Sequence, residues 1–86
     1  MDINSLNLII EKKISQNISC KKIIIEDKTY LHKNHKGHEK NKFHIKLIIK
    51  SDELLKMNRI ESTKKIYKIL EDELKYYIHS IEVLLN

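Results

Sequence analysis

The stretch HIKLIIK, residues 44–50, decides the fold class because its apolar and polar side chains alternate. Ile45, Leu47 and Ile49 fall on one side of an extended chain, opposite to His44 and two lysines. This period of two is typical of a β-strand with one face in a core and the other in water. We therefore predict a strand over residues 44–50, with His44 at its start on the solvent side.

The residues before this strand predict a helix, a second strand and a loop. Apolar side chains recur at helical spacing over residues 5–16. Residues 21–27 contain three consecutive isoleucines, whose β-branched side chains favour a strand. Residues 28–43 have no apolar period and hold the only glycine, Gly37, so we expect a long exposed loop there.

The residues after the strand predict two helices and a third strand. Ser51 can cap a short helix over residues 52–57. Apolar spacing indicates the longest helix over residues 60–76, and alternation indicates a strand over residues 78–85. The order αββααβ predicts an α+β fold, in which a small three-stranded sheet is covered on one face by helices.

Length and composition favour one soluble domain over residues 1–86. The chain has 86 residues, of which 41% are hydrophobic, enough for one core and too few for a second. Its apolar runs are shorter than the ~18 residues of a membrane span, and its N-terminus lacks the basic start of a secretory signal. The single cysteine excludes an internal disulfide. We expect a cytoplasmic protein that does not bind membranes.

The net charge of +5 and the pI near 9.3 are compatible with nucleic-acid binding. However, Arg59 is the only arginine, and the abundance of Lys, Ile and Asn also fits AT-rich codons. Proteins that read bases depend on the arginine fork, which lysine does not reproduce. Two interpretations therefore remain, a nucleic-acid surface and a solvated lysine surface. One glycine cannot form a Gly-x-x-Gly clamp or a phosphate-binding glycine loop.

The histidines are the residues that can carry chemistry. His32, His35 and His38 lie three apart in the predicted loop and could bind zinc, nickel or copper, or could simply be exposed. His79 lies near the start of the last strand, where it is either a ligand or a hydrogen-bonded edge residue. Cys20 is typical of an inert packed thiol. The sequence contains none of the common catalytic motifs, so we do not expect an enzyme.

Three short motifs follow one another from residue 27 onward. They are DKTYLH at residues 27–32, HIKLIIKSD at residues 44–52, and Glu73-Leu74 followed by IHSI at residues 78–81. Each is similar to a motif of the BolA family, namely Asp-x-Ser-x-x-His (or Cys in place of His), the strand from His-Phe to Ser-Asp, and Glu-Leu followed by Ile-His-Ala-Leu. The chain departs from the family at residues 62–64, Ser-Thr-Lys, where Arg-His-Arg is usual.

The resemblance implies a fold similar to class II KH domains and a monothiol glutaredoxin as partner. In such complexes a [2Fe–2S] cluster bridges the two proteins, with a glutaredoxin cysteine and glutathione supplying thiolates. The resemblance implies that His79 and a loop histidine, His32 or alternatively His35, are the ligands from this chain. It also implies an adaptor in iron–sulfur trafficking, maturation or iron sensing, which alone is a monomer or weak homodimer without a cofactor.

A different function that the resemblance allows is a DNA-binding regulator of transcription or stress response. Its contacts would be Lys64, Lys65 and Lys68 on the predicted long helix. The missing Arg-His-Arg motif weakens this expectation.

Overall fold

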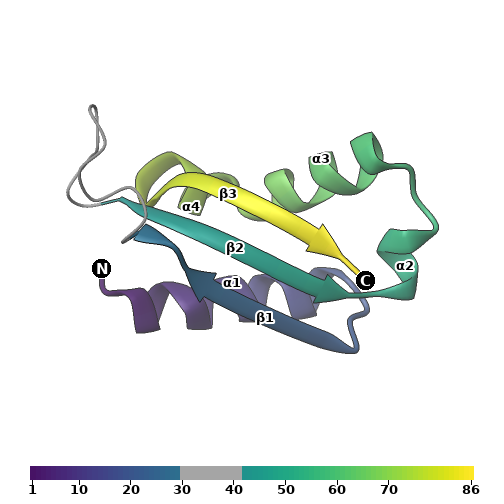
Figure 1. Ribbon diagram of the computed structural model, residues 1–86, viewed down its shortest axis with the longest axis horizontal. Helices are drawn as coiled ribbons and strands as arrows, with labels where there is room; N and C mark the ends of the chain where they lie inside the picture. The colour runs from purple at the N-terminus through teal and green to yellow at the C-terminus, as the bar shows by residue number, and fades with distance from the viewer. Residues whose placement is uncertain (30–41) are drawn as a thin grey trace.

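The computed structural model describes residues 1–29 and 42–86, which form a sheet with helices on one of its faces (Figure 1). The elements in these residues are α1 (Ile3–Asn17), β1 (Lys22–Asp27), β2 (Phe43–Lys50), α2 (Asp52–Leu55), α3 (Arg59–Ile69), α4 (Glu71–Tyr76) and β3 (Ile78–Leu85). The predicted α+β class and the order αββααβ are confirmed, with one difference: the last predicted helix is divided in two.

The central strand of the sheet is β2, in the order β1-β2-β3. It is antiparallel to β1, with Lys22 opposite Lys50 and Asp27 opposite Ile45. It is parallel to β3. Parallel neighbours need a long crossover connection, which α2, α3 and α4 provide here.

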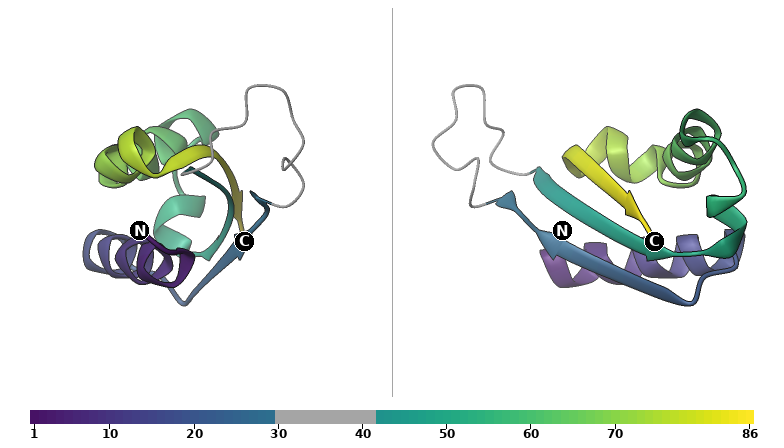
Figure 2. Two further views of the ribbon diagram at one scale, coloured as in Figure 1. Left: turned by 90° about the vertical axis from the view of Figure 1, so that its left-hand side faces the viewer. Right: turned by 45° about the vertical axis from the view of Figure 1, so that its right-hand side comes forward.

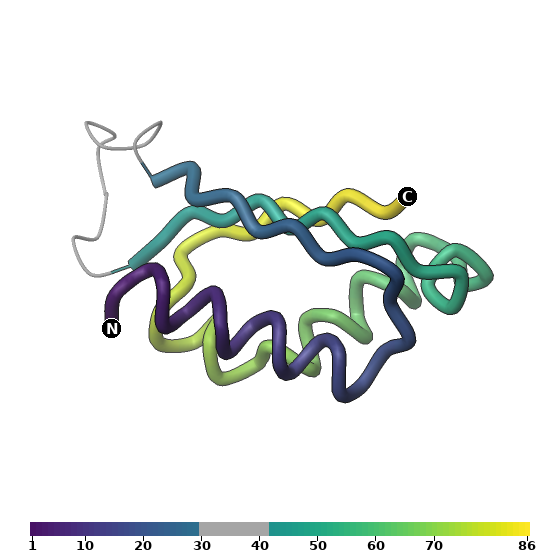
Figure 3. Tube along the Cα trace, turned by 90° about the horizontal axis from the view of Figure 1, so that it is seen from below, coloured from purple at the N-terminus to yellow at the C-terminus, as the bar shows by residue number. Residues whose placement is uncertain are grey.

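The helices lie along one side of the sheet (Figures 2 and 3), and the buried apolar side chains of the core lie between them and the sheet. The predicted inward set of β2 is confirmed, since Ile45, Leu47 and Ile49 are at most 2% exposed. Apolar side chains of the helices complete this cluster; they include Leu6, Ile10 and Ile14 of α1, Leu54 of α2, Ile66 of α3 and Leu70 beside it. Within the described residues, every helix is too short or too polar to cross a membrane.

Side chains cap the N-terminal ends of α1 and α2. The predicted cap at Ser51 is confirmed, because its Oγ accepts a hydrogen bond from the Leu54 backbone N–H at 3.2 Å. The same hydroxyl donates to the Ser19 carbonyl at 2.7 Å, which ties α2 to the start of the β1 region. Asp2 caps α1 by accepting from the Ser5 N–H at 2.8 Å.

The prediction of a single helix over residues 60–76 is wrong, because the helix breaks at Leu70. The backbone of Leu70 leaves the helical region (φ −99°, ψ 20°) while its side chain is fully buried. Three acidic residues, 71–73, follow at once, and negative side chains stabilise the N-terminal end of a new helix. The break lets α4 lead directly into β3, which begins two residues after Tyr76.

Candidate functional site

A bulge near the start of β3 sets the orientation of His79. Phe43 pairs with Ile78, but the next residue, His44, pairs with Ser80, so that His79 is an extra residue in β3. Ile78 and Ile81 both pack towards the core although they are three positions apart. In a regular strand neighbouring side chains point to opposite faces. The bulge instead leaves His79 and Ser80 both exposed.

His44 was predicted on the solvent side, and this prediction is wrong: the residue is only 4% exposed. Its ring Nδ1 lies 2.6 Å from Ser80 Oγ, and its Nε2 lies 3.3 Å from His79 Nδ1. The two imidazole rings meet edge to face, with centroids 4.8 Å apart and planes at 85°. The bulge explains the burial, because it places two consecutive side chains of β3 against one ring of β2.

Hydrogen bonds tie the end of β1 to the start of β2 beside this pair. The Lys28 N–H donates to the His44 carbonyl at 2.7 Å, and the His44 N–H donates to Thr29 Oγ1 at 3.2 Å. Asp27 Oδ1 accepts from both the backbone N–H and the hydroxyl of Thr29, an Asx-type turn. We call these contacts of Asp27, Lys28, Thr29 and His44 the loop root. They give the Asp-x-Thr motif a structural role.

The loop root flanks residues 30–41 on both sides. The candidate ligands His32 and His35, together with His38, lie outside the described residues. The structure therefore brings together His79, His44 and Ser80, and describes no loop ligand beside them. Among residues 1–29 and 42–86, His, Cys, Asp and Glu form no group of three or more that could hold a metal ion.

Charged side chains lie beside His44. A hollow next to it is lined by Lys28, Lys46, Ser80 and Glu82, among others. Lys28 also forms an ion pair with Glu26 at 2.8 Å. The hydrogen bond and the positive charge of Lys28 lower the pKa of the Glu26 carboxyl below its ordinary value, so Glu26 remains ionised at neutral pH.

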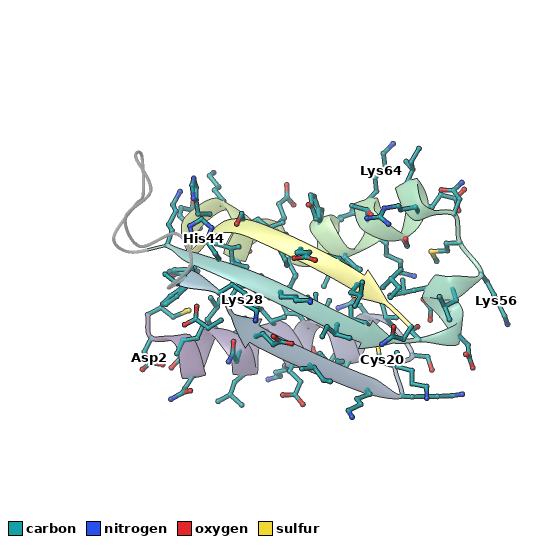
Figure 4. All side chains as sticks on the ribbon, in the orientation of Figure 1. Asp2, Cys20, Lys28, His44, Lys56 and Lys64 are labelled. Carbon is teal, nitrogen blue, oxygen red and sulfur yellow. The ribbon has the colours of Figure 1, made fainter. Side chains whose placement is uncertain are left out.

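Cys20 lies at the other end of the sheet from His44 (Figure 4). The backbone of the adjacent Lys21 bonds to Lys50, at the opposite end of β2. The six residue-to-residue steps from His44 to Lys50 span about 20 Å at the usual strand rise. Partial burial raises the pKa of the Cys20 thiol, with the charge of Glu53 adding to the effect. Cys20 therefore cannot share a ligand set with His79.

The three candidate nucleic-acid lysines all lie on α3 but differ in exposure and in partners. Lys64 and Lys68 are exposed on α3, whereas Lys65 forms an ion pair with Glu53 of α2 at 2.8 Å. A hydrogen bond from Lys65 is the main reason that the pKa of Glu53 lies below its ordinary value. Lys64 is far along the molecule from His44 (Figure 4), so the lysines and the histidine pair are separate features.

Sequence reasoning missed Ser80 and the partnership of His44 with His79. The motif Ile-His-Ser-Ile at residues 78–81 held a signal, because two polar residues between two core residues break the period of two. That break marks a bulge. The identity of the residue opposite the bulge depends on strand register, which the motif alone does not give.

Comparison with known proteins places this geometry in a family. A family model described as BolA-like protein matches residues 14–85. A curated relative from Haemophilus influenzae, named DNA-binding transcriptional regulator BolA, is 30% identical over 77 residues, which cover 90% of this chain and 72% of the relative. The chain belongs to the BolA family.

Solved BolA structures have the same fold. The BolA domain of SufE1 from Arabidopsis thaliana superposes with a TM-score of 0.78 at 23% identity, covering 100% of this chain and 93% of that one. BolA1 from the same plant gives a TM-score of 0.73 at 22% identity, covering 90% and 85%. At these identities the likeness concerns the fold. The helices on one face of a three-stranded mixed sheet are thus the BolA arrangement.

Proposed function

We propose that this BolA protein is a non-enzymatic adaptor that binds a monothiol glutaredoxin and shares a bridging [2Fe–2S] cluster with it. The cluster would serve iron–sulfur trafficking, maturation or iron sensing in the cytoplasm. The observation that carries the proposal is the state of His79: the ring is exposed on a bulge, and its Nδ1 is engaged by His44. Its Nε2 is then the ring nitrogen available to a metal.

The second ligand from this chain is proposed to be His32, with His35 as the alternative. His32 follows Thr29 by only three residues, and Thr29 is hydrogen-bonded to His44. Covalent geometry limits the Cα distance from Thr29 to His32 to about 11 Å. This covalent limit supports His32, which is nearer in sequence to the loop root than His35, as the proposed ligand.

The thiolates must come from a partner. Iron–sulfur clusters are usually held by cysteine thiolates, and two imidazoles can replace two of them and raise the reduction potential. The single cysteine of this chain is remote from His79, and its raised pKa keeps it protonated. A glutaredoxin cysteine and a glutathione thiolate would complete a set of two sulfur and two nitrogen ligands.

Reconstitution tests the proposal directly. The chain is mixed with a monothiol glutaredoxin, iron, sulfide and glutathione, and the product is examined by size-exclusion chromatography and visible absorbance. We expect a heterodimer with cluster absorbance that His79→Ala alters or abolishes. His32→Ala and His35→Ala identify the loop ligand, and His38→Ala is the matched control. An unchanged spectrum and complex with His79→Ala would contradict the assignment.

A second candidate function is DNA binding, which is favoured by the name of the Haemophilus influenzae relative, a DNA-binding transcriptional regulator. The contacts would come from α3, where Lys64 and Lys68 are exposed and flank the half-exposed Tyr67. Lysines bind phosphates, and an aromatic ring can add stacking. Lys65 is a weaker candidate because of its ion pair with Glu53.

Salt dependence tests this second function. Binding to a labelled duplex is measured by fluorescence anisotropy between low and near-physiological salt. We expect the double variant Lys64→Gln/Lys68→Gln to make the slope of log K against log salt less steep by about 2, since each phosphate contact contributes about 0.9. Lys12→Gln, exposed on α1, is the control. An equal slope for both variants would exclude α3 as the contact surface.

A further inference from the structure

His44, Ser80 and His79 form a continuous line of hydrogen-bonding groups. The line runs from Ser80 Oγ to His44 Nδ1 at 2.6 Å, and from His44 Nε2 to His79 Nδ1 at 3.3 Å. Both ring nitrogens of the buried His44 thus have a partner. The second distance is at the long end of the hydrogen-bond range, while the first is short.

The protons in such a line are coupled. A neutral imidazole carries one N–H and one lone pair. If His44 donates from Nδ1 to Ser80, its Nε2 has a lone pair that accepts from Nδ1–H of His79. The Nε2 of His79 then has a lone pair of its own. In the reverse arrangement, Ser80 donates to His44, His44 donates to His79, and His79 carries its proton on Nε2, where a metal would bind.

We propose that His44, supported by Ser80, is a positioning residue that orients the His79 imidazole and favours its Nδ1–H tautomer. The ring nitrogen that remains, Nε2, is then ready to act as a ligand. The inference rests on the proposed ligand role of His79 and adds the group that prepares it. Metal-binding histidines usually donate their second ring N–H to such a partner, which fixes both tautomer and orientation.

The bulge is what makes this arrangement possible. Because His79 is an extra residue in β3, it and Ser80 are both exposed and both contact the ring of His44. In a regular strand, one of the two would point towards the core. Bulges often redirect a side chain beside a functional site. The edge-to-face contact of the two rings further restricts rotation of His79.

The test uses the isolated chain, without iron. The tautomer of His79 is read from the ¹⁵N chemical shifts of its ring nitrogens by NMR. We expect the Nδ1–H form to predominate in the unsubstituted protein and the Nε2–H form to gain in His44→Phe, which keeps a ring and removes both hydrogen-bonding atoms. His44→Gln supplies an acceptor and a donor, so we expect it to restore the Nδ1–H form at least in part.

Two further variants distinguish the loss of a hydrogen bond from the loss of the fold. Ser80→Ala removes the end of the line and Ser80→Thr preserves its hydroxyl, so we expect only Ser80→Ala to shift the tautomer. Amide spectra verify that each variant is folded. A His79 that carries its proton on Nε2 in the unsubstituted protein, or a tautomer that does not respond to His44→Phe and Ser80→Ala, would overturn the inference.

A second measurement uses the complex with glutaredoxin. We expect His44→Phe to weaken cluster retention against a chelator by about 10- to 100-fold, as is usual when the partner of a metal-binding histidine is removed, and His44→Gln to weaken it less. Equal cluster retention in His44→Phe and His44→Gln would contradict the positioning role. If the unsubstituted chain formed no cluster complex at all, the proposed function would fail, whereas the tautomer result, obtained without iron, would still stand.

Discussion

Cys20 is half-buried in the link between α1 and β1, and the carboxylate of Glu53 lies near enough to influence it. Burial is the larger cause of its raised pKa and the negative charge of Glu53 is the smaller one. Metals and electrophiles react with the thiolate and not with the thiol. At neutral pH, the sulfur of this chain is therefore held in its unreactive form.

We predict that Cys20 is alkylated slowly. A raised pKa means that the thiolate fraction at pH 7 is smaller in the folded chain than in the unfolded one, so iodoacetamide should react several-fold more slowly with the folded chain. The rate should rise with pH through a midpoint above that of the unfolded chain. Mass spectrometry of timed samples, with and without denaturant, measures both rates. Faster reaction of the folded chain would contradict the prediction.

The helices α1 and α4 are joined by one ion pair. Glu73 of α4 is 5% exposed and accepts two hydrogen bonds from Nζ of Lys13 in α1, at 2.9 and 2.8 Å. A charge buried this deeply needs a partner. The acidic residue of the Glu-Leu motif therefore stabilises the fold and does not take part in the histidine site.

We predict that Glu73→Gln lowers the free energy of unfolding by about 1–2 kcal/mol, because the charge-assisted bonds to Lys13 are lost. Urea denaturation followed by circular dichroism measures the change. Glu71→Gln is the matched control, since Glu71 is exposed at the start of the same helix. Equal stability of the two variants would show that the pair contributes little.

The sequence predicts the strands better than it predicts the helices. Alternation in β2 and the isoleucine run in β1 place both strands to within one residue, because each pattern follows from local geometry. The break at Leu70 is not predicted, since Ile66, Leu70 and Leu74 keep helical spacing across it. The burial of Leu70 in the core depends on tertiary contacts, which a local sequence pattern does not record.

At the scale of the whole molecule, one part of the candidate site depends on the pairing of β2 with β3. The sequence does not predict that part. The family motif singles out His79, and the structure shows that this residue is exposed on the bulge; its role as a ligand stays a prediction. The burial of His44 requires that β2 lie parallel to β3 and that the register shift at His79. These facts join residues 35 positions apart, so a motif within one strand cannot contain them.

The loop root has a consequence for how such proteins can diverge. Thr29 is bonded to Asp27 and to His44, so contacts among the described residues join the end of β1 to the start of β2 on either side of residues 30–41. Doubling the length of a connecting segment costs only about 0.6 kcal/mol in closure entropy. Insertions, deletions and exchanges of one donor side chain for another can then accumulate there over generations. Related proteins can therefore keep the same sheet while different side chains occupy the segment between β1 and β2.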